Sequence, residues 1–169
     1  DEPNVDQAWN AHCMSGTEGA ELIPGLPKIT HYNFIVYKGI EPNMHPYSGV
    51  FHDANKKIST GLAEFYTHYD IDTIIVGGLA LDYCVKDTVI DLCRCGFGVI
   101  VNLAATRAIG DVQDAIVAMQ RHGAVIIQSL DELQPIEVSN ERIVSLQEKS
   151  GASKALVLSV LKILPNGND

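Results

Sequence analysis

From Asn33 onward, short apolar runs alternate with longer segments of helical periodicity. This alternation is typical of βαβ units, in which helices pack on a parallel sheet. The pattern therefore predicts an α/β fold with a mainly parallel central sheet. The predicted strands are 33–37, 73–76, 99–103 and 124–128, and the predicted helices are 59–69, 83–95 and 112–122.

The two ends of the chain do not follow this alternation. The first thirty residues are rich in Pro, Gly and Asn and predict no strand. Near the other end, residues 138–149 predict an amphipathic helix with Ser139 as a candidate N-cap, and residues 153–164 predict a more apolar helix. We therefore expect one domain over residues 1–134 and a helical extension over residues 135–169.

Composition narrows the class of protein. With 46% hydrophobic and 20% charged residues in 169, the chain can form a single globular domain with a real core. A net charge of -9 argues against a nucleic-acid partner. The most apolar stretch, 155–164, is far shorter than the roughly 20 residues of a spanning helix, so we expect no membrane segment. Four cysteines without a signal peptide favour reduced thiols and a cytoplasmic location.

Cys84 lies where a nucleophile would be placed. An apolar run typical of a buried strand ends at Gly77 and Gly78, and Cys84 comes at the start of the next predicted helix. A helix N-terminus stabilises a thiolate and offers N–H donors to an oxyanion. Position alone fits an inert buried cysteine equally well. Lys38, at the end of the strand predicted over 33–37, could supply a positive charge to the thiolate or be an ordinary solvated lysine.

Other candidate residues are ambiguous taken one by one. His12 could be a metal ligand, a base or a surface residue, and the neighbouring Cys13 does not complete a zinc site because no second ligand pair has the required spacing. Tyr47 could line an aromatic pocket or anchor its loop, and Trp9 has the same two interpretations.

Taken together, several segments resemble the nicotinamidases (pyrazinamidases) of the isochorismatase-like cysteine hydrolases. The resemblance runs from about Asp6 to Leu133 and agrees in order and spacing. It implies a three-layer α/β sandwich with a mainly parallel central sheet. The segments that carry it are 9–17, 19–22, 38–39, 47–49 and 78–85, with the sequences WNAHCMSGT, GAEL, KG, YSG and GLALDYCV.

The resemblance implies a role for each matching residue. Cys84 would attack the carboxamide carbon, expel ammonia and leave a thioester for water to hydrolyse, while Lys38 would stabilise the thiolate. Leu79-Ala80 matches a cis peptide bond that would aim the N–H groups of Ala80 and Cys84 at the oxyanion. The residues that match the substrate-binding wall are Trp9, Tyr47, Leu79 and Tyr83.

The resemblance also implies a cofactor and a substrate. His12 matches a ligand of a divalent metal, with zinc favoured and manganese or iron as alternatives. The substrate would be a small aromatic amide, nicotinamide, deamidated in NAD salvage. Two alternatives stay open: a related small-amide hydrolase, and an inactive homologue that serves as a subunit or binding module. A homo-oligomer is also left open.

One part of the family pattern is missing from this sequence. The family's third catalytic residue is an aspartate at the end of an N-terminal strand, followed by an Asp-x-His metal pair, all upstream of the Trp-x-x-His-Cys segment. Asp6 lies only a few residues before His12 with no strand ahead of it, so we do not take it as the general base. We therefore expect the N-terminal strand to be missing, with low activity and marginal stability for the chain alone.

Overall fold

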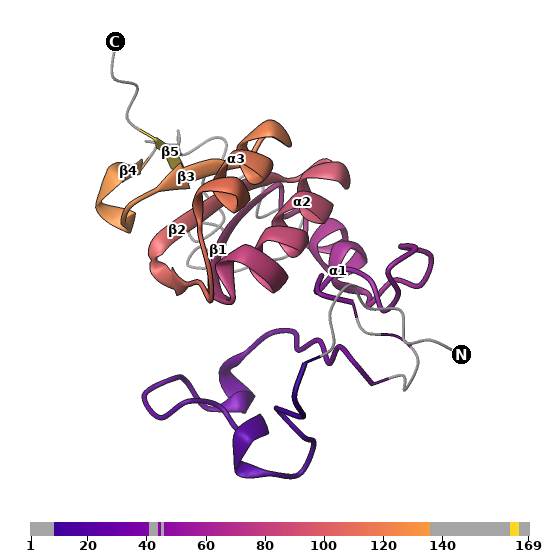
Figure 1. Ribbon diagram of the computed structural model, residues 1–169. Coiled ribbons are helices and arrows are strands. Elements are labelled where there is room, and N and C mark those ends of the chain that lie inside the picture. Colours follow the sequence, from indigo (N-terminus) through magenta and orange to yellow (C-terminus); the bar gives the residue numbers. More distant parts are fainter. Residues whose placement is uncertain (1–8, 41–43, 45, 136–162, 166–169) are drawn as a thin grey trace.

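The computed structural model describes residues 9–40, 44, 46–135 and 163–165. A parallel sheet with the strand order β1-β2-β3 lies at its centre, and helices α2 and α3 pack against each other and against the sheet (Figure 1). The parallel α/β architecture expected from the sequence is confirmed. The strands of this sheet are β1 (Thr73–Leu79), β2 (Gly98–Arg107) and β3 (Val125–Ile127), and the helices are α1 (Leu62–His68), α2 (Lys86–Arg94) and α3 (Gln113–Arg121).

A close approach of β1 to β2 explains one of the two glycines that interrupt the apolar run. The strands pair in register from Thr73 opposite Gly98, and the register shifts between Val76 and Gly78. A Cβ on Gly77 would lie 2.9 Å from the Ala105 Cβ, well inside van der Waals contact. The glycine therefore lets β1 continue past the irregularity to the turn that carries Cys84.

The core lies between the sheet and the helices. Its fully buried members include Val101 from β2, Val89 and Leu92 from α2, and Met119 from α3. The carboxylate of Asp91, also on α2, is buried among them and bonds to the ammonium of Lys56. A charge removed from water needs such a partner, so this ion pair ties the loop before α1 to α2.

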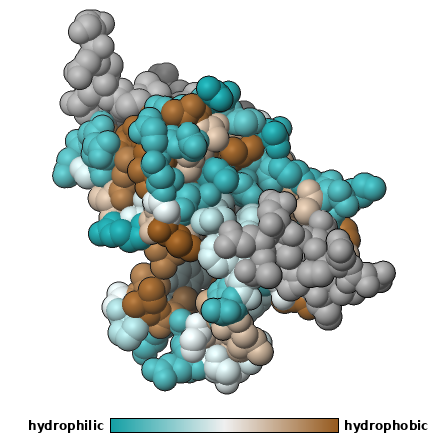
Figure 2. Space-filling model, viewed as in Figure 1, coloured by the Kyte–Doolittle hydropathy of each residue, from teal (hydrophilic) through white to brown (hydrophobic). Residues whose placement is uncertain are grey.

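Residues 9–40 form a looped segment that extends away from the sheet (Figure 1). It contains two short 3-10 helices, Glu18–Ala20 and Ile29–His31, and none of their residues is buried. Brown hydrophobic patches are visible on its surface (Figure 2). The large hydrophobic side chains exposed in this segment include Leu22, Ile23, Leu26 and Ile29.

The strand predicted over 33–37 is wrong. These residues form no strand; instead, the ring of Phe34 stacks on Phe65 of α1, with centroids 4.5 Å apart. An apolar run becomes a strand only where another strand pairs with it, and here the run contributes a ring contact instead. Most of the other predicted elements are present with shifted ends. The helix expected from residue 83 is the exception, because its first turn is a π-helix, Leu81–Val85, and α2 begins only at Lys86.

Two helices are predicted for the C-terminal region. The helix predicted over 138–149 lies outside the described residues. Of the helix predicted over 153–164, residues 163 and 164 belong instead to strand β5 (Ile163–Pro165), which pairs antiparallel with β4 (Leu133–Pro135), so this part of the prediction is wrong. The backbone hydrogen bonds of these residues are made with β4. No helix in the described part of the chain is long and apolar enough to cross a membrane.

Candidate active site

Cys84 sits in a turn directly after the end of β1. The carbonyl of Ala80 accepts hydrogen bonds from the amides of Tyr83 at 3.1 Å and Val85 at 3.0 Å, which closes the π-helical turn Leu81–Val85. Val85 is 5% exposed, while the cysteine is only partly buried. The turn is therefore anchored in the core while its thiol stays accessible. As the resemblance implied, the peptide bond between Leu79 and Ala80 is cis.

Lys38 brings a positive charge to this thiol. Its Nζ donates to the Cys84 Sγ at 3.5 Å and to the carbonyl oxygen of Pro46 at 3.2 Å. The two catalytic candidates lie 46 positions apart in the chain and meet only in the folded protein. An ammonium group in contact with a cysteine sulfur is an arrangement that stabilises a thiolate nucleophile.

Three aromatic rings gather beside the cysteine. Tyr83 precedes Cys84, and its ring lies 5.0 Å from that of Trp9 in an edge arrangement and 5.4 Å from that of Tyr47. The indole Nε1 of Trp9 donates to the hydroxyl of Tyr47 at 3.1 Å. These rings form an aromatic wall next to the nucleophile, suited to contact a flat ring. Leu79, the fourth predicted substrate-binding residue, is exposed at the end of β1.

Comparison with known proteins places this chain in one family. Residues 3–131 match the family described as the Isochorismatase domain, which is well over half of the chain. The chain belongs to this family. A curated relative, the nicotinamidase of Acinetobacter baylyi, is 38% identical over 124 residues, which cover 72% of this chain and 57% of the relative. The isochorismatase-domain chain thus spans little more than half the length of that relative.

Solved structures show the same fold with ligands bound. The structure of PnC1 from L. infantum in complex with nicotinate superposes on the isochorismatase-domain chain with a TM-score of 0.66 and 29% identity, covering 72% of this chain and 61% of that one. The pyrazinamidase of Pyrococcus horikoshii, solved in complex with zinc, has a TM-score of 0.62 and 29% identity, covering 72% and 63%. The similarity is therefore to proteins solved with nicotinate in one case and zinc in the other.

His12 does not belong to a cluster of three or more metal-ligating side chains within the described residues. Its side chain is exposed, and Nδ1 lies 2.6 Å from the carbonyl oxygen of Asn10. In residues 9–40, 44, 46–135 and 163–165 no three or more His, Cys, Asp or Glu side chains are grouped as a metal would require. One imidazole is less than the three or four protein ligands of a zinc centre. The described residues therefore do not make up a complete metal site.

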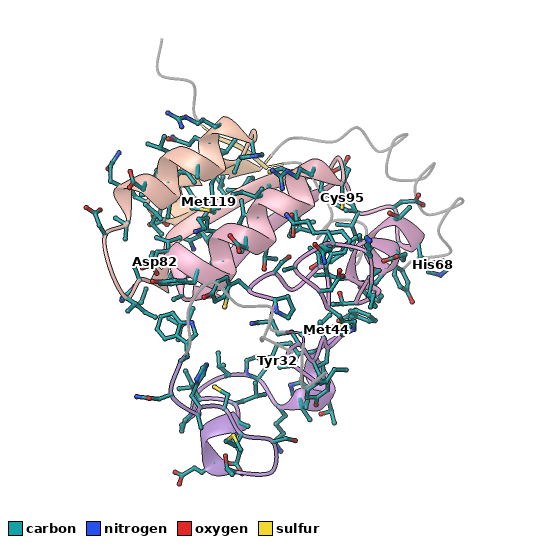
Figure 3. All side chains as sticks on the ribbon, turned by 45° about the vertical axis from the view of Figure 1, so that its right-hand side comes forward. Tyr32, Met44, His68, Asp82, Cys95 and Met119 are labelled. Carbon is teal, nitrogen blue, oxygen red and sulfur yellow. The ribbon has the colours of Figure 1, made fainter. Side chains whose placement is uncertain are left out.

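Two residues of this region were missed in the sequence. Asp82, labelled in Figure 3, accepts hydrogen bonds from the amides of Ile109 at 3.1 Å and Gly110 at 2.8 Å, which ties the Cys84 turn to the loop after β2. Partial burial opposes the charged form, yet these amides outweigh it and lower the pKa of Asp82 below its usual value. Thr88, on α2, bonds to the Cys84 carbonyl. The four-residue spacing from Cys84 to Thr88 was the available signal, because residues i and i+4 share a helix face.

Proposed function

We propose that this chain carries the nucleophile, the activating lysine and the ring-binding wall of a nicotinamidase, which hydrolyses nicotinamide to nicotinate and ammonia. The single observation that carries the proposal is the contact of 3.5 Å between Lys38 Nζ and Cys84 Sγ, next to the rings of Trp9, Tyr47 and Tyr83. A charged thiolate beside an aromatic wall is suited to a carboxamide carried on a flat ring.

The chemistry follows from these groups in two steps. The Cys84 thiolate attacks the carboxamide carbon, so that a C–S bond forms and the C–N bond breaks, while the nitrogen takes up a proton from water and leaves as ammonia. Water then attacks the thioester, releases the acid and returns the sulfur to its starting state. Lys38, which donates to Sγ and to the Pro46 carbonyl, holds its charge against the sulfur before attack and after release.

The identity of the substrate rests on the aromatic wall together with the comparisons. The A. baylyi relative is named a nicotinamidase, and the L. infantum protein was solved with nicotinate, the product of this reaction. An amide with no ring would leave Trp9, Tyr47 and Tyr83 without a stacking partner. We therefore favour nicotinamide, and its deamidation in NAD salvage, over an aliphatic amide.

Ammonia release from nicotinamide tests the proposal. We expect Cys84→Ala to abolish turnover, because the substitution removes the sulfur that Lys38 Nζ contacts. Cys95→Ala is the matched control: partial desolvation of its sulfur, reinforced by the nearby carboxylates of Asp91 and Glu64, raises the pKa of the Cys95 thiol, so its loss should leave turnover unchanged. Undiminished turnover in Cys84→Ala would refute the assignment.

A second candidate is an inactive homologue that serves as a subunit or binding module. Its support is that the partners of Lys38 Nζ among the described residues are a carbonyl and a thiol, with no carboxylate to act as a general base. Proton transfer by such a base typically contributes a factor of about 10² to 10⁴. Cys84 that is readily alkylated while the wild-type protein releases no ammonia from any amide would favour this candidate.

We further propose that the protein binds a divalent metal, with zinc favoured, and that His12 is one of its ligands. The zinc complex of the P. horikoshii pyrazinamidase supports the metal, and the contact of His12 Nδ1 with the Asn10 carbonyl leaves Nε2 available as a ligand. Loss of bound zinc in His12→Ala, measured by elemental analysis, would support it, and unchanged zinc would contradict it.

The four free cysteines support a reducing, cytoplasmic location.

A further inference from the structure

We propose that Thr88 is a positioning residue of the active site, whose hydroxyl couples the loop that carries Tyr47 to the turn that carries Cys84. The proposal rests on the function proposed above. The hydroxyl of Thr88 bonds to backbone groups and is not part of the aromatic wall. Its effect on the reaction would be exerted through the backbone of Gly49 and of Cys84.

The hydroxyl of Thr88 makes two hydrogen bonds with fixed directions. Its Oγ1 donates to the Cys84 carbonyl oxygen at 2.7 Å and accepts from the Gly49 amide at 2.8 Å. A carbonyl can only accept and an amide N–H can only donate, so the single hydroxyl proton must go to Cys84. Donation and acceptance at one oxygen strengthen each other.

The second of these bonds distinguishes Thr88 from an ordinary helical threonine. Threonines in helices commonly donate to the carbonyl four residues earlier, as Thr67 does to Ala63 in α1 at 2.9 Å. Such a bond joins residues of one helical turn and does not link segments that are distant in the chain. At Thr88 the acceptor is the carbonyl of the nucleophile Cys84. The Thr88 hydroxyl oxygen also accepts a hydrogen bond from the amide of Gly49, 39 positions earlier in the chain.

The loop and the turn are bridged at a second point by Lys38. Its Nζ bonds to the carbonyl of buried Pro46 and to the Cys84 sulfur, so the ammonium is held between the same two segments. Tyr47 lies between the two bridged residues, Pro46 and Gly49. If the Thr88 bridge is removed, the loop can shift. That shift would move the Pro46 carbonyl, and with it the lysine, relative to the sulfur.

The coupling predicts two linked changes in Thr88→Val, which replaces the hydroxyl by a methyl group. Alkylation of Cys84 by iodoacetamide near neutral pH should slow by about fivefold, the effect of losing one hydrogen bond. This slowing would report a changed contact between the lysine and the sulfur, which lie 3.5 Å apart in the wild-type protein. The KM for nicotinamide should rise by a similar factor, because Tyr47 moves with the loop.

The experiment measures Cys84 alkylation across pH by peptide mapping, with exposed Cys13 and Cys95 as internal references. Thr88→Ser keeps the hydroxyl and should behave as wild type. Thr67→Val removes the equivalent local bond in α1 and should leave both Cys84 alkylation and KM unchanged. A folded Thr88→Val protein whose Cys84 profile superimposes on wild type would overturn the proposal.

Two arms keep the outcome decisive. If Thr88→Val does not fold, Thr88→Ala removes the hydroxyl without adding bulk and is measured in the same way. Hydrogen exchange of the Gly49 amide in the wild-type protein is an independent readout, and fast exchange would also overturn the coupling. If the wild-type protein does not release ammonia, the proposed function fails, while alkylation still decides the role of Thr88.

Discussion

The contact between β1 and β2 at Gly77 is the most direct place to test how the sheet positions the active site. A Cβ added to Gly77 would lie 2.9 Å from the Ala105 Cβ and 3.0 Å from the Ala105 carbonyl oxygen. A Cβ atom essentially never lies this close to another side-chain carbon, so Gly77→Ala must push the two strands apart. The displaced strand is the one that leads into the Cys84 turn.

The size of the effect follows from two opposing terms. Overpacking of this kind costs roughly 1–3 kcal/mol of folding free energy. Alanine in place of glycine restricts the unfolded chain, which returns about 0.4–1 kcal/mol where the native backbone accepts a side chain. The backbone of Gly77 does not have a positive φ, so alanine fits its conformation and the gain from restricting the unfolded chain applies. The difference between these terms spans about 0–2.6 kcal/mol, and we expect a net loss of roughly 1 kcal/mol in the free energy of unfolding.

Urea unfolding followed by circular dichroism measures this loss as a lower midpoint. A second variant, Ala105→Gly, removes the nearer clashing atom, the Cβ, and leaves the carbonyl oxygen in place. Gly77→Ala should therefore lower the free energy of unfolding less in the Ala105→Gly background than in the wild-type protein, but should still lower it. A double-mutant cycle isolates that coupling. If Gly77→Ala unfolded at the wild-type midpoint, the close approach would not constrain the sheet and the reasoning would be refuted.

Three further predictions address the acid response, the core and the aromatic wall. Folding lowers the pKa of Asp82, so the contribution of this carboxylate to stability is present above the unfolded pKa of about 3.9 and is lost as the pH falls through the lower folded value. Asp82→Asn should therefore flatten the pH dependence of the unfolding free energy in this acid range, and an unaltered slope would argue against the prediction. Met119→Ala, at a side chain 0% exposed, should cost about 2–5 kcal/mol in a thermal or urea melt, and a loss below about 1 kcal/mol would mean that the site collapses around the cavity. Trp9→Phe keeps a ring but removes the donor to the Tyr47 hydroxyl, so the KM for nicotinamide should rise a few-fold with little change in kcat, whereas a fall confined to kcat would place Trp9 in the chemistry instead.

The strands of the central sheet were predictable because their local pattern matches their environment. Residues 73–76 and 99–103 are rich in Val and Ile, and they form the first parts of β1 and β2. The extension of β1 to Leu79 was not predictable, since Gly77 and Gly78 interrupt the pattern and only the neighbouring strand continues the pairing. The strand prediction for residues 33–37 was wrong for a related reason. These residues have the composition of a strand, but composition does not show whether another strand pairs with them, and they form no strand.

The sequence by itself determined the class of fold and, through the resemblance, named Cys84, Lys38 and the aromatic residues, because residue type and order are carried along the chain. Only the tertiary structure decided that Lys38 Nζ lies 3.5 Å from Cys84 Sγ, that the rings of Trp9, Tyr47 and Tyr83 meet, and that Thr88 links two of these segments. These contacts join residues far apart in the chain, and their geometry depends on how the strands, turns and loops pack. Local propensity carries no information about that distance.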